Sequence, residues 1–317
     1  MSAKPKIPTI WDIPREELFA PGHRMCQGCG AAILMRHITK ALGKDAIIVE
    51  ATGCVEVTTT VYPQTAWKHP WLHIAFENAA AGASGVEAAI KALKRKGVIP
   101  KDKKVKVVAI GGDGGTFDIG LQALSGMLER RHNVLYIVYD NEAYMNTGIQ
   151  RSGATPYKAW TTTTPVGKVW RGEWRPKKDI MGIVLAHRVP YAATVNPAYI
   201  TDLYMKVRKA VEIEGPTFIH AFSPCTPGWR IDPALTVTVA RLAVQTGVWI
   251  NYEVENGEFR VTTPVPRRKP VREYLKLQGR FRHLTEEEIA EIQRMVDEEV
   301  ERINKLVGKT VIGPVVE

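Results

Sequence analysis

The sequence predicts an α/β protein built around a parallel β-sheet that is flanked by helices. Short, nearly continuous apolar runs alternate with amphipathic stretches along most of the chain. Apolar runs of this kind are typical of strands that are buried on both faces. The alternation is typical of parallel sheets, because a crossover helix must return the chain to the same end of the sheet before the next strand begins.

The predicted strands are rich in β-branched residues, whereas the predicted helices carry an apolar residue at every third or fourth position. We expect strands over residues 46–50, 105–110, 134–140, 191–195 and 217–222. We expect helices over residues 31–42, 78–96, 120–131 and 199–214. Ligands of such sheets bind at the carboxyl ends of the strands. The loops after Glu50, Ile110 and Val138 are therefore the first places to search for a site.

The composition changes near residue 256, where prolines begin to alternate with basic residues. We therefore expect an α/β domain over residues 1–255 and a C-terminal basic arm plus amphipathic helix over residues 256–317. Thr285 and Glu288 form a capping-box pattern at the start of this helix. Its apolar stripe consists of Ile289, Ile292, Val296, Val300, Ile303 and Val307. The stripe predicts that the helix packs either on this domain or on a neighbouring chain.

The composition places the chain among globular proteins and excludes a disordered or fibrous one. Of its 317 residues, 45% are hydrophobic and 24% are charged, which is close to the globular average. We expect no membrane-spanning helix, since no run of eighteen apolar residues occurs. The first residues lack the apolar core of a signal peptide, and the cysteines are too sparse for a secreted disulfide scaffold. We therefore expect a cytoplasmic protein.

The net charge of +10 is compatible with binding to nucleic acid, to an anionic membrane or to an acidic protein. The basic residues are concentrated in the arm near residues 267–282, where aromatic residues are not interleaved with them and no second CxxC motif occurs. We therefore expect neither nucleic acid nor a membrane as a partner. The charge is better explained by contacts with other subunits or with an acidic protein partner.

The four cysteines lie in loops that contain glycine or proline. Cys26 and Cys29 form a CxxC motif, Cys54 follows in the sequence ATGCVE, and Cys225 lies in SPCTPGW. Short turns of this kind allow several thiolates to converge on one metal centre. The pattern favours a shared metal or cluster site over unrelated buried thiols or a redox disulfide. The spacing alone leaves both zinc and iron–sulfur open.

A glycine-rich loop, GGDGGTFDIG, follows the strand predicted over residues 105–110. Its glycines leave backbone N–H groups free to face an anion, and the helix that follows adds its positive N-terminal end. An aspartate inside an anion-binding loop requires a cation, so Asp113 implies a divalent metal. Asp140 and Asn141, at the end of the next strand, offer Mg²⁺ further oxygen ligands. The sequence therefore predicts a metal-bridged diphosphate, rather than a nicotinamide-type turn, whose GxGxxG is absent, or a simple helix cap at Asp113.

The GDG triplet at residues 112–114, followed by Asn141, resembles the thiamine diphosphate motif. Together with the CxxC motif, the TGC turn and Cys225, it makes the chain similar to the β subunits of pyruvate and related 2-oxoacid:ferredoxin oxidoreductases. The resemblance runs from about Gly22 to Cys225. It implies a thiamine diphosphate-binding (PP-type) fold with a C-terminal arm and helix. It also implies three cofactors: thiamine diphosphate, Mg²⁺ and a [4Fe–4S] cluster.

The resemblance assigns roles to individual residues. It implies that Asp113, the side-chain oxygen of Asn141 and the backbone carbonyl of Ala143 hold Mg²⁺. Asn146 and Thr147 would stand beside the reacting carbon as catalytic residues. The cofactor-binding residues would be Gly53, Cys54, Gly112, Asp113, Gly114, Gly115 and Asn141. The ligands of the cluster would be Cys26, Cys29, Cys54 and Cys225.

The implied reaction is the oxidative decarboxylation of a 2-oxoacid, either pyruvate or a branched-chain acid. Coenzyme A receives the acyl group, CO₂ leaves, and the electrons pass singly through the cluster to ferredoxin. Thiamine enzymes need an activating glutamate from a second domain, which this sequence does not contain, so we expect an α subunit to supply it. The γ and δ subunits would be further partners. A non-redox thiamine diphosphate decarboxylase or transferase subunit with a structural zinc site is the alternative.

Several polar residues near these motifs carry no motif of their own. Glu50, Glu56 and Glu77 are interpreted as surface or structural residues rather than as the activating glutamate. His23 and His73 are interpreted as structural or hydrogen-bonding residues rather than as catalytic bases.

Overall fold

The computed structural model describes residues 9–316. Residues 1–8, which belong to the segment where no signal peptide is expected, and residue 317 lie outside the described residues. Within the described range no helix combines the length and the apolar character that crossing a membrane requires.

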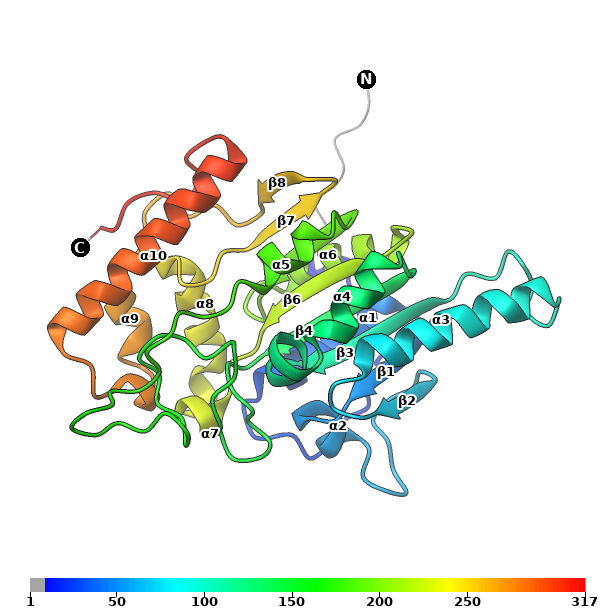
Figure 1. Ribbon diagram of the computed structural model, residues 1–317, viewed down its shortest axis with the longest axis horizontal. Coiled ribbons are helices and arrows are strands. Elements are labelled where there is room, and N and C mark those ends of the chain that lie inside the picture. Colours follow the sequence, from blue (N-terminus) through cyan, green and yellow to red (C-terminus); the bar gives the residue numbers. More distant parts are fainter. Residues whose placement is uncertain (1–8, 317) are drawn as a thin grey trace.

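Eight strands form one sheet in the order β2-β1-β3-β4-β6-β5-β7-β8 (Figure 1). Every pairing from β2 to β5 in this order is parallel, whereas β7 and β8 join the sheet in antiparallel fashion. The strands are β1 (Ala46–Ala51), β2 (Trp71–Ile74), β3 (Lys106–Gly112), β4 (Val134–Asp140), β5 (Tyr191–Val195), β6 (Thr217–Phe222), β7 (Tyr252–Glu255) and β8 (Glu258–Val261). The predicted α/β fold is confirmed, and all five predicted strands are present.

Of the three strands that the sequence did not predict, β2 and β8 form the edges of the sheet, and β7 lies between β5 and β8. β2 is exposed at its central residues, Leu72 and His73, so it lacks the continuous apolar run of a buried strand. β7 and β8 are each four residues long and form a hairpin. Strands this short carry little hydrophobic signal, because the apolar pattern extends over only a few residues.

Helices cover both faces of the sheet. Ile48 and Val49 of β1 point to opposite faces, the first toward the cluster that includes α1 and α6 and the second toward the cluster that includes α3 and α4. Figure 1 shows these helices around the sheet. The α-helices are α1 (Gly30–Leu42), α2 (Cys54–Thr59), α3 (Ala79–Arg95), α4 (Leu121–Glu129), α5 (Ile180–Ala186), α6 (Ile200–Glu212), α7 (Thr226–Trp229), α8 (Thr236–Thr246), α9 (Val271–Leu275) and α10 (Glu286–Val307). The short helical turns are η1 (Ile10–Asp12), η2 (Gly114–Ile119), η3 (Pro233–Leu235) and η4 (Gly279–Phe281).

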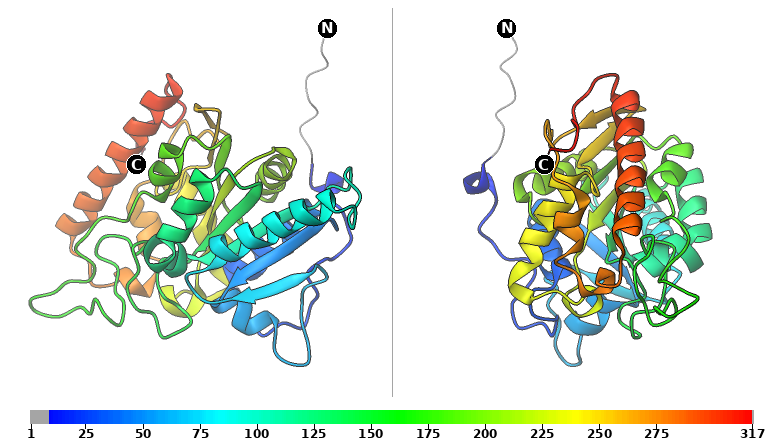
Figure 2. Two further views of the ribbon diagram at one scale, coloured as in Figure 1. Left: turned by 45° about the vertical axis from the view of Figure 1, so that its right-hand side comes forward. Right: turned by 90° about the vertical axis from the view of Figure 1, so that its left-hand side faces the viewer.

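The C-terminal arm and helix pack on this chain. α10 begins with the predicted capping box, in which the Thr285 side chain accepts from the backbone N–H of Glu288. Val300 and Ile303 of α10 are buried in the same cluster as residues of the sheet, and Figure 2 shows the helix lying along the outer side of the molecule. The hairpin of β7 and β8 spans residue 255, so the domain boundary expected there falls between two paired strands.

Candidate active site

Four of the predicted site residues follow the carboxyl ends of four parallel strands. Cys54 follows β1, Asp113 follows β3, Asn141 follows β4 and Cys225 follows β6. These strands run in the same direction, so their carboxyl ends lie at one edge of the sheet. This arrangement explains how residues far apart in the sequence reach a common site.

A pocket opens at this edge and brings most of the predicted cofactor residues together. Its lining residues are Thr52, Gly53, Cys54, Phe76, Gly112, Asp113, Gly114, Tyr139, Asn141, Ala143, Tyr144, Met145, Asn146 and Thr147. Gly115 is the one predicted cofactor residue outside this lining. It is buried in η2, where a side chain would meet the backbone oxygen of Phe76.

The glycines of the site make room for two tyrosines. A Cβ atom on Gly53 would lie 2.4 Å from the Tyr139 hydroxyl, and one on Gly114 would lie 2.6 Å from the ring of Tyr144. The loop that follows β3 is not extended, because residues 114–119 form one π-helical turn. The N-terminal end of this turn faces the pocket through Asp113 and Gly114, which is where a diphosphate is expected to bind.

The side chains of Asp113 and Asn141 and the backbone carbonyl of Ala143 converge at one point. One side-chain amide atom of Asn141 lies 2.9 Å from Asp113 Oδ1 and 2.9 Å from the Ala143 carbonyl oxygen. If this atom is nitrogen, it donates to both oxygens; if it is oxygen, three oxygens face one another. Neighbouring ligands of an octahedral Mg²⁺ with bonds of about 2.0–2.1 Å lie about 2.9 Å apart. The residues therefore fit the predicted magnesium site.

The electrostatics of Asp113 also fit a cation. Burial, followed by the charge of Asp140, raises the pKa of Asp113 well above its usual value. The hydroxyl of Ser152 donates to Asp113 Oδ2 at 2.5 Å, and the backbone N–H of Asn141 donates to Asp113 Oδ1 at 3.3 Å. A buried carboxylate of this kind is costly to ionise without a positive partner.

A buried ion-pair network lies directly behind the loop of residues 140–143. Lys177 Nζ lies 2.6 Å from Asp140 Oδ2 and 2.9 Å from Glu142 Oε1. Arg280 contacts the other oxygen of Glu142 at 2.6 Å, and His220 Nε2 lies 2.7 Å from Asp140. The network fixes the two residues that flank Asn141. No motif in the sequence indicated this network, because Lys177 and Arg280 lie far along the chain from residues 140–143 and outside any recognisable pattern.

Hydrogen bonds hold the loops of the cysteines against one another. The backbone N–H of Gly30 donates to the Pro224 carbonyl at 3.0 Å, and Thr226 Oγ1 donates to the Gln27 carbonyl at 2.8 Å. The CxxC loop is thereby joined to the loop that carries Cys225. Cys29 caps α1, Cys54 begins α2 and Cys225 caps α7.

The four thiols are close enough to influence one another. Burial, together with the neighbouring thiolates of Cys225 and Cys29, raises the pKa of Cys54 to about 12. Burial, together with the thiolates of Cys29 and Cys26, raises the pKa of Cys225 to about 12. Asn146 donates a hydrogen bond to Cys54. Cys54 therefore belongs both to the pocket and to the group of thiols.

The polar residues that carry no motif lie around the site. Glu50 is fully buried below the TGC turn, so it is not a surface residue; it accepts from Trp71 Nε1 at 2.8 Å, and its other oxygen has no partner. His73 is partly exposed and contacts Thr52 Oγ1 at 2.7 Å. The pocket lining includes none of the three glutamates Glu50, Glu56 and Glu77.

Comparisons with known proteins agree with this site. Residues 51–221 match the family described as the thiamine pyrophosphate enzyme, C-terminal TPP binding domain. The chain is 61% identical to the pyruvate synthase subunit PorB of Methanocaldococcus jannaschii over 91% of this chain and 97% of that protein. It is 50% identical to the ketoisovalerate oxidoreductase subunit VorB of Pyrococcus abyssi over 93% of this chain and 94% of that protein.

A solved 2-oxoglutarate:ferredoxin oxidoreductase from Magnetococcus marinus has the same fold, with a TM-score of 0.51 at 24% identity. The match covers 68% of this chain and 76% of that one. The relatives with 50% identity or more span nearly the whole chain, and the thiamine pyrophosphate match covers the strands that build the pocket. The chain therefore belongs to the family of 2-oxoacid oxidoreductase β subunits that contains the PorB subunits of pyruvate synthase and the VorB subunits of ketoisovalerate oxidoreductase.

Proposed function

We propose that this chain is the thiamine diphosphate-binding β subunit of a 2-oxoacid:ferredoxin oxidoreductase. The complex would oxidatively decarboxylate pyruvate or a branched-chain 2-oxoacid, transfer the acyl group to coenzyme A and pass the electrons singly to ferredoxin. The observation that carries this proposal is the position of Cys54, which lines the pocket of Asp113 and also lies within the group of four thiols. A decarboxylation site and an electron acceptor would then share one wall.

In this proposal the residues of the pocket bind and orient the cofactor. Thiamine diphosphate, when bound, supplies the carbon nucleophile for the decarboxylation. Asp113, Asn141 and the Ala143 carbonyl would hold Mg²⁺, and the N-terminal end of η2 would receive the diphosphate. Asn146 and Thr147 lie on the segment after Ala143 and line the same pocket, so they would be available to the reacting carbon.

We infer that the four thiols hold a [4Fe–4S] cluster rather than a structural zinc ion. The support is the position of Cys54, which lines the pocket of Asp113 and is influenced by the thiolates of Cys225 and Cys29. A cluster at this position could accept the electrons of an oxidative decarboxylation, whereas a zinc ion has no redox chemistry.

The metal content of anaerobically purified protein tests this assignment. We expect iron and acid-labile sulfide in equal amounts, together with the brown absorption of sulfide-to-iron charge transfer. The variant Cys225→Ser should lose this absorption, whereas Ser223→Ala, two residues away, should retain it. Colourless protein with stoichiometric zinc would instead support the non-redox decarboxylase or transferase.

The proposed partners follow from what the pocket lacks. The described chain contributes no glutamate to the pocket lining, and thiamine enzymes require one against the aminopyrimidine. An α subunit would supply that glutamate, and the γ and δ subunits would complete the complex and its electron path to ferredoxin.

A further inference from the structure

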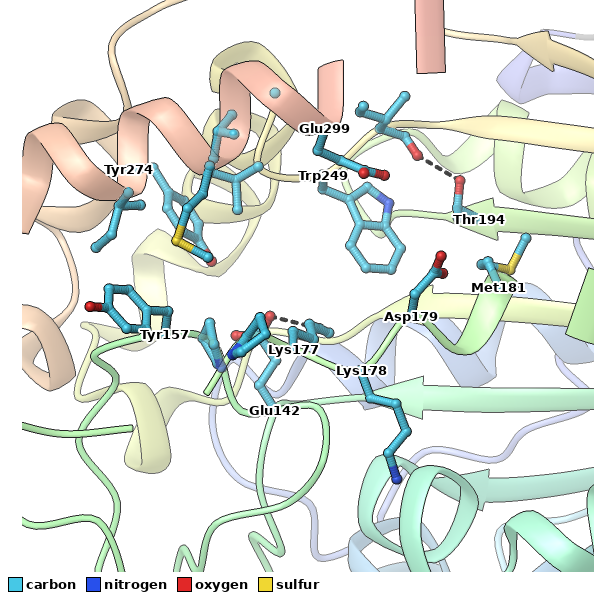
Figure 3. A pocket seen from close by; sticks show the side chains of 18 of the residues that line it. Glu142, Tyr157, Lys177, Lys178, Asp179, Met181, Thr194, Trp249, Tyr274 and Glu299 are labelled. Carbon is cyan, nitrogen blue, oxygen red and sulfur yellow. Dashed lines mark hydrogen bonds and ion pairs between the residues drawn. The ribbon is translucent and has the colours of Figure 1, made fainter. Parts of the chain in front are cut away.

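A second cavity lies on the other side of the loop of residues 140–143. It is bounded by α5, by α10 and by the segment that connects α8 to β7, and Figure 3 shows the side chains that line it. Glu142 belongs to its wall, whereas none of the residues predicted to bind thiamine diphosphate, Mg²⁺ or the cluster lines it. The cavity is therefore distinct from the pocket described above.

The wall of this cavity is mainly apolar and aromatic. Its aromatic and methionine lining side chains are Tyr157, Met181, Trp249, Tyr252, Tyr274, Phe281 and Met295. Small-molecule sites typically combine such walls with a few polar groups that fix the orientation of the ligand. The two methionines add adaptability, because their unbranched side chains can adjust to the shape of a ligand.

The charged side chains of the wall already have partners. Four contacts account for them: Lys177 with Glu142 at 2.9 Å, Arg302 with Glu299 at 2.7 Å, Lys178 with Asp118 at 3.1 Å, and Asp179 with the backbone N–H of Gly182 at 2.8 Å. A charged ligand would have to break one of these contacts or enter without a counter-charge. The cavity therefore favours an uncharged ligand.

Trp249 provides a hydrogen-bond donor without an acceptor. Its side chain is 7% exposed, and its Nε1 is buried and has no partner. The ring is fixed by His220 and Phe222, whose centroids lie 4.7 and 4.8 Å away. Figure 3 shows the indole nitrogen on the side of the ring toward Glu299, whose oxygens both accept from Arg302. A buried unsatisfied donor is unfavourable, so an acceptor on a bound ligand would supply the missing partner.

We propose that this cavity is a second binding site, which takes an uncharged aromatic molecule whose carbonyl oxygen accepts from Trp249 Nε1–H. The proposal does not depend on the function proposed above. Glu142 and Lys177 line this cavity and also form the ion pairs that fix the residues on either side of Asn141. A ligand in the cavity would therefore contact residues that support the active site.

Two probes of nearly equal shape test the site. Acetophenone carries a carbonyl oxygen where α-methylstyrene carries a methylene group. Their dissociation constants are measured by calorimetry with the full-length chain and with its native complex, for the wild type and for Trp249→Phe. We expect the variant to weaken acetophenone relative to α-methylstyrene by about twofold to tenfold, the range for one neutral hydrogen bond.

A pair of variants on α10 locates the binding. Met295→Trp fills the cavity and should abolish binding of both probes, whereas Arg294→Trp, which lies outside the cavity lining, should leave binding unchanged. An unchanged ratio of affinities in Trp249→Phe, or binding that survives Met295→Trp, would overturn the proposal. Binding to the isolated chain that disappears in the native complex would also overturn it, because a partner subunit would then fill the cavity.

Discussion

Asp113 and Asp140 lie at the ends of neighbouring strands, and their pKa values move in opposite directions. Burial and the charge of Asp140 raise the pKa of Asp113. Burial would also raise the pKa of Asp140, but the charge of Lys177 and the hydrogen bond from His220 outweigh it and lower that pKa. Asp140 therefore has its cation within the protein, whereas the proposed Mg²⁺ would supply the cation for Asp113.

Replacing Lys177 tests how far this network supports the site. We expect Lys177→Met to lower the free energy of unfolding by about 3 kcal/mol, because it leaves Asp140 and Glu142 buried with less counter-charge. The binding of Mg²⁺ and thiamine diphosphate should weaken as well. Lys178→Met is the matched control, since Lys178 pairs with Asp118 at the surface and should change both quantities little. Equal effects of the two variants would contradict the role given to the network.

Glu50 gives the chain a distinct pH dependence. Burial raises the pKa of Glu50 to about 8, so the folded protein holds this proton more tightly than the unfolded chain does. Its contribution to stability is complete below the unfolded pKa and is lost as the pH rises from about 5 to about 8. We expect Glu50→Gln, which mimics the protonated acid, to be stabilised relative to the wild type by up to about 4 kcal/mol at pH 8. Equilibrium unfolding at pH 5 and pH 8 measures the difference, which should be small at pH 5.

At the level of elements, the long parallel strands determine where the site lies, and the irregular segments determine what surrounds it. Residues 141–179 connect β4 to α5 without a further helix or strand, yet they contribute Tyr144, Asn146 and Thr147 to the pocket. Lys177, near the end of this segment, lies at the carboxyl end of β4, where it pairs with Asp140. The segment is thus held in place by ion pairs and individual hydrogen bonds rather than by the regular hydrogen bonds of a helix or a sheet.

Arg268 joins four parts of the C-terminal region. Its guanidinium donates to the carbonyls of Gly313 and Thr246 and to Asp297 of α10. We expect Arg268→Met to cost about 2 kcal/mol in the free energy of unfolding, because hydrogen bonds to a charged donor are lost in a buried setting. The exposed Arg272, which pairs with Glu286 at the surface, serves as the control. Arg272→Met should cost under about 1 kcal/mol, and chemical denaturation compares the two.

At the level of the whole molecule, one mixed sheet carries the pocket, and the described residues that line this pocket include no glutamate. We expect the purified chain to bind thiamine diphosphate with Mg²⁺ but to show no turnover of a 2-oxoacid with an artificial electron acceptor. Adding the α subunit should restore turnover, and an α subunit whose activating glutamate is changed to glutamine should not. Sustained turnover by the isolated chain would contradict the proposed division of labour.

The residues at the strand ends show which parts of the site could be predicted from local sequence. Asp113 and Asn141 could be assigned to one site because each follows a recognisable buried strand, and parallel strands end at a common edge. Cys225 could be added only as the partner of a CxxC motif. The strands β2, β7 and β8 were not predicted, because each is only four residues long and β2 and β8 are partly exposed.

The sequence by itself determined the α/β fold, the positions of five buried strands along the chain and the residues that follow their carboxyl ends, because each of these depends on short-range periodicity and composition. Only the tertiary structure decided that Lys177 and Arg280 neutralise Asp140 and Glu142, that Glu50 is buried, and that Trp249 faces a second cavity. These contacts join residues separated by long irregular segments, and the charges and packing that select them arise only when the whole sheet has assembled.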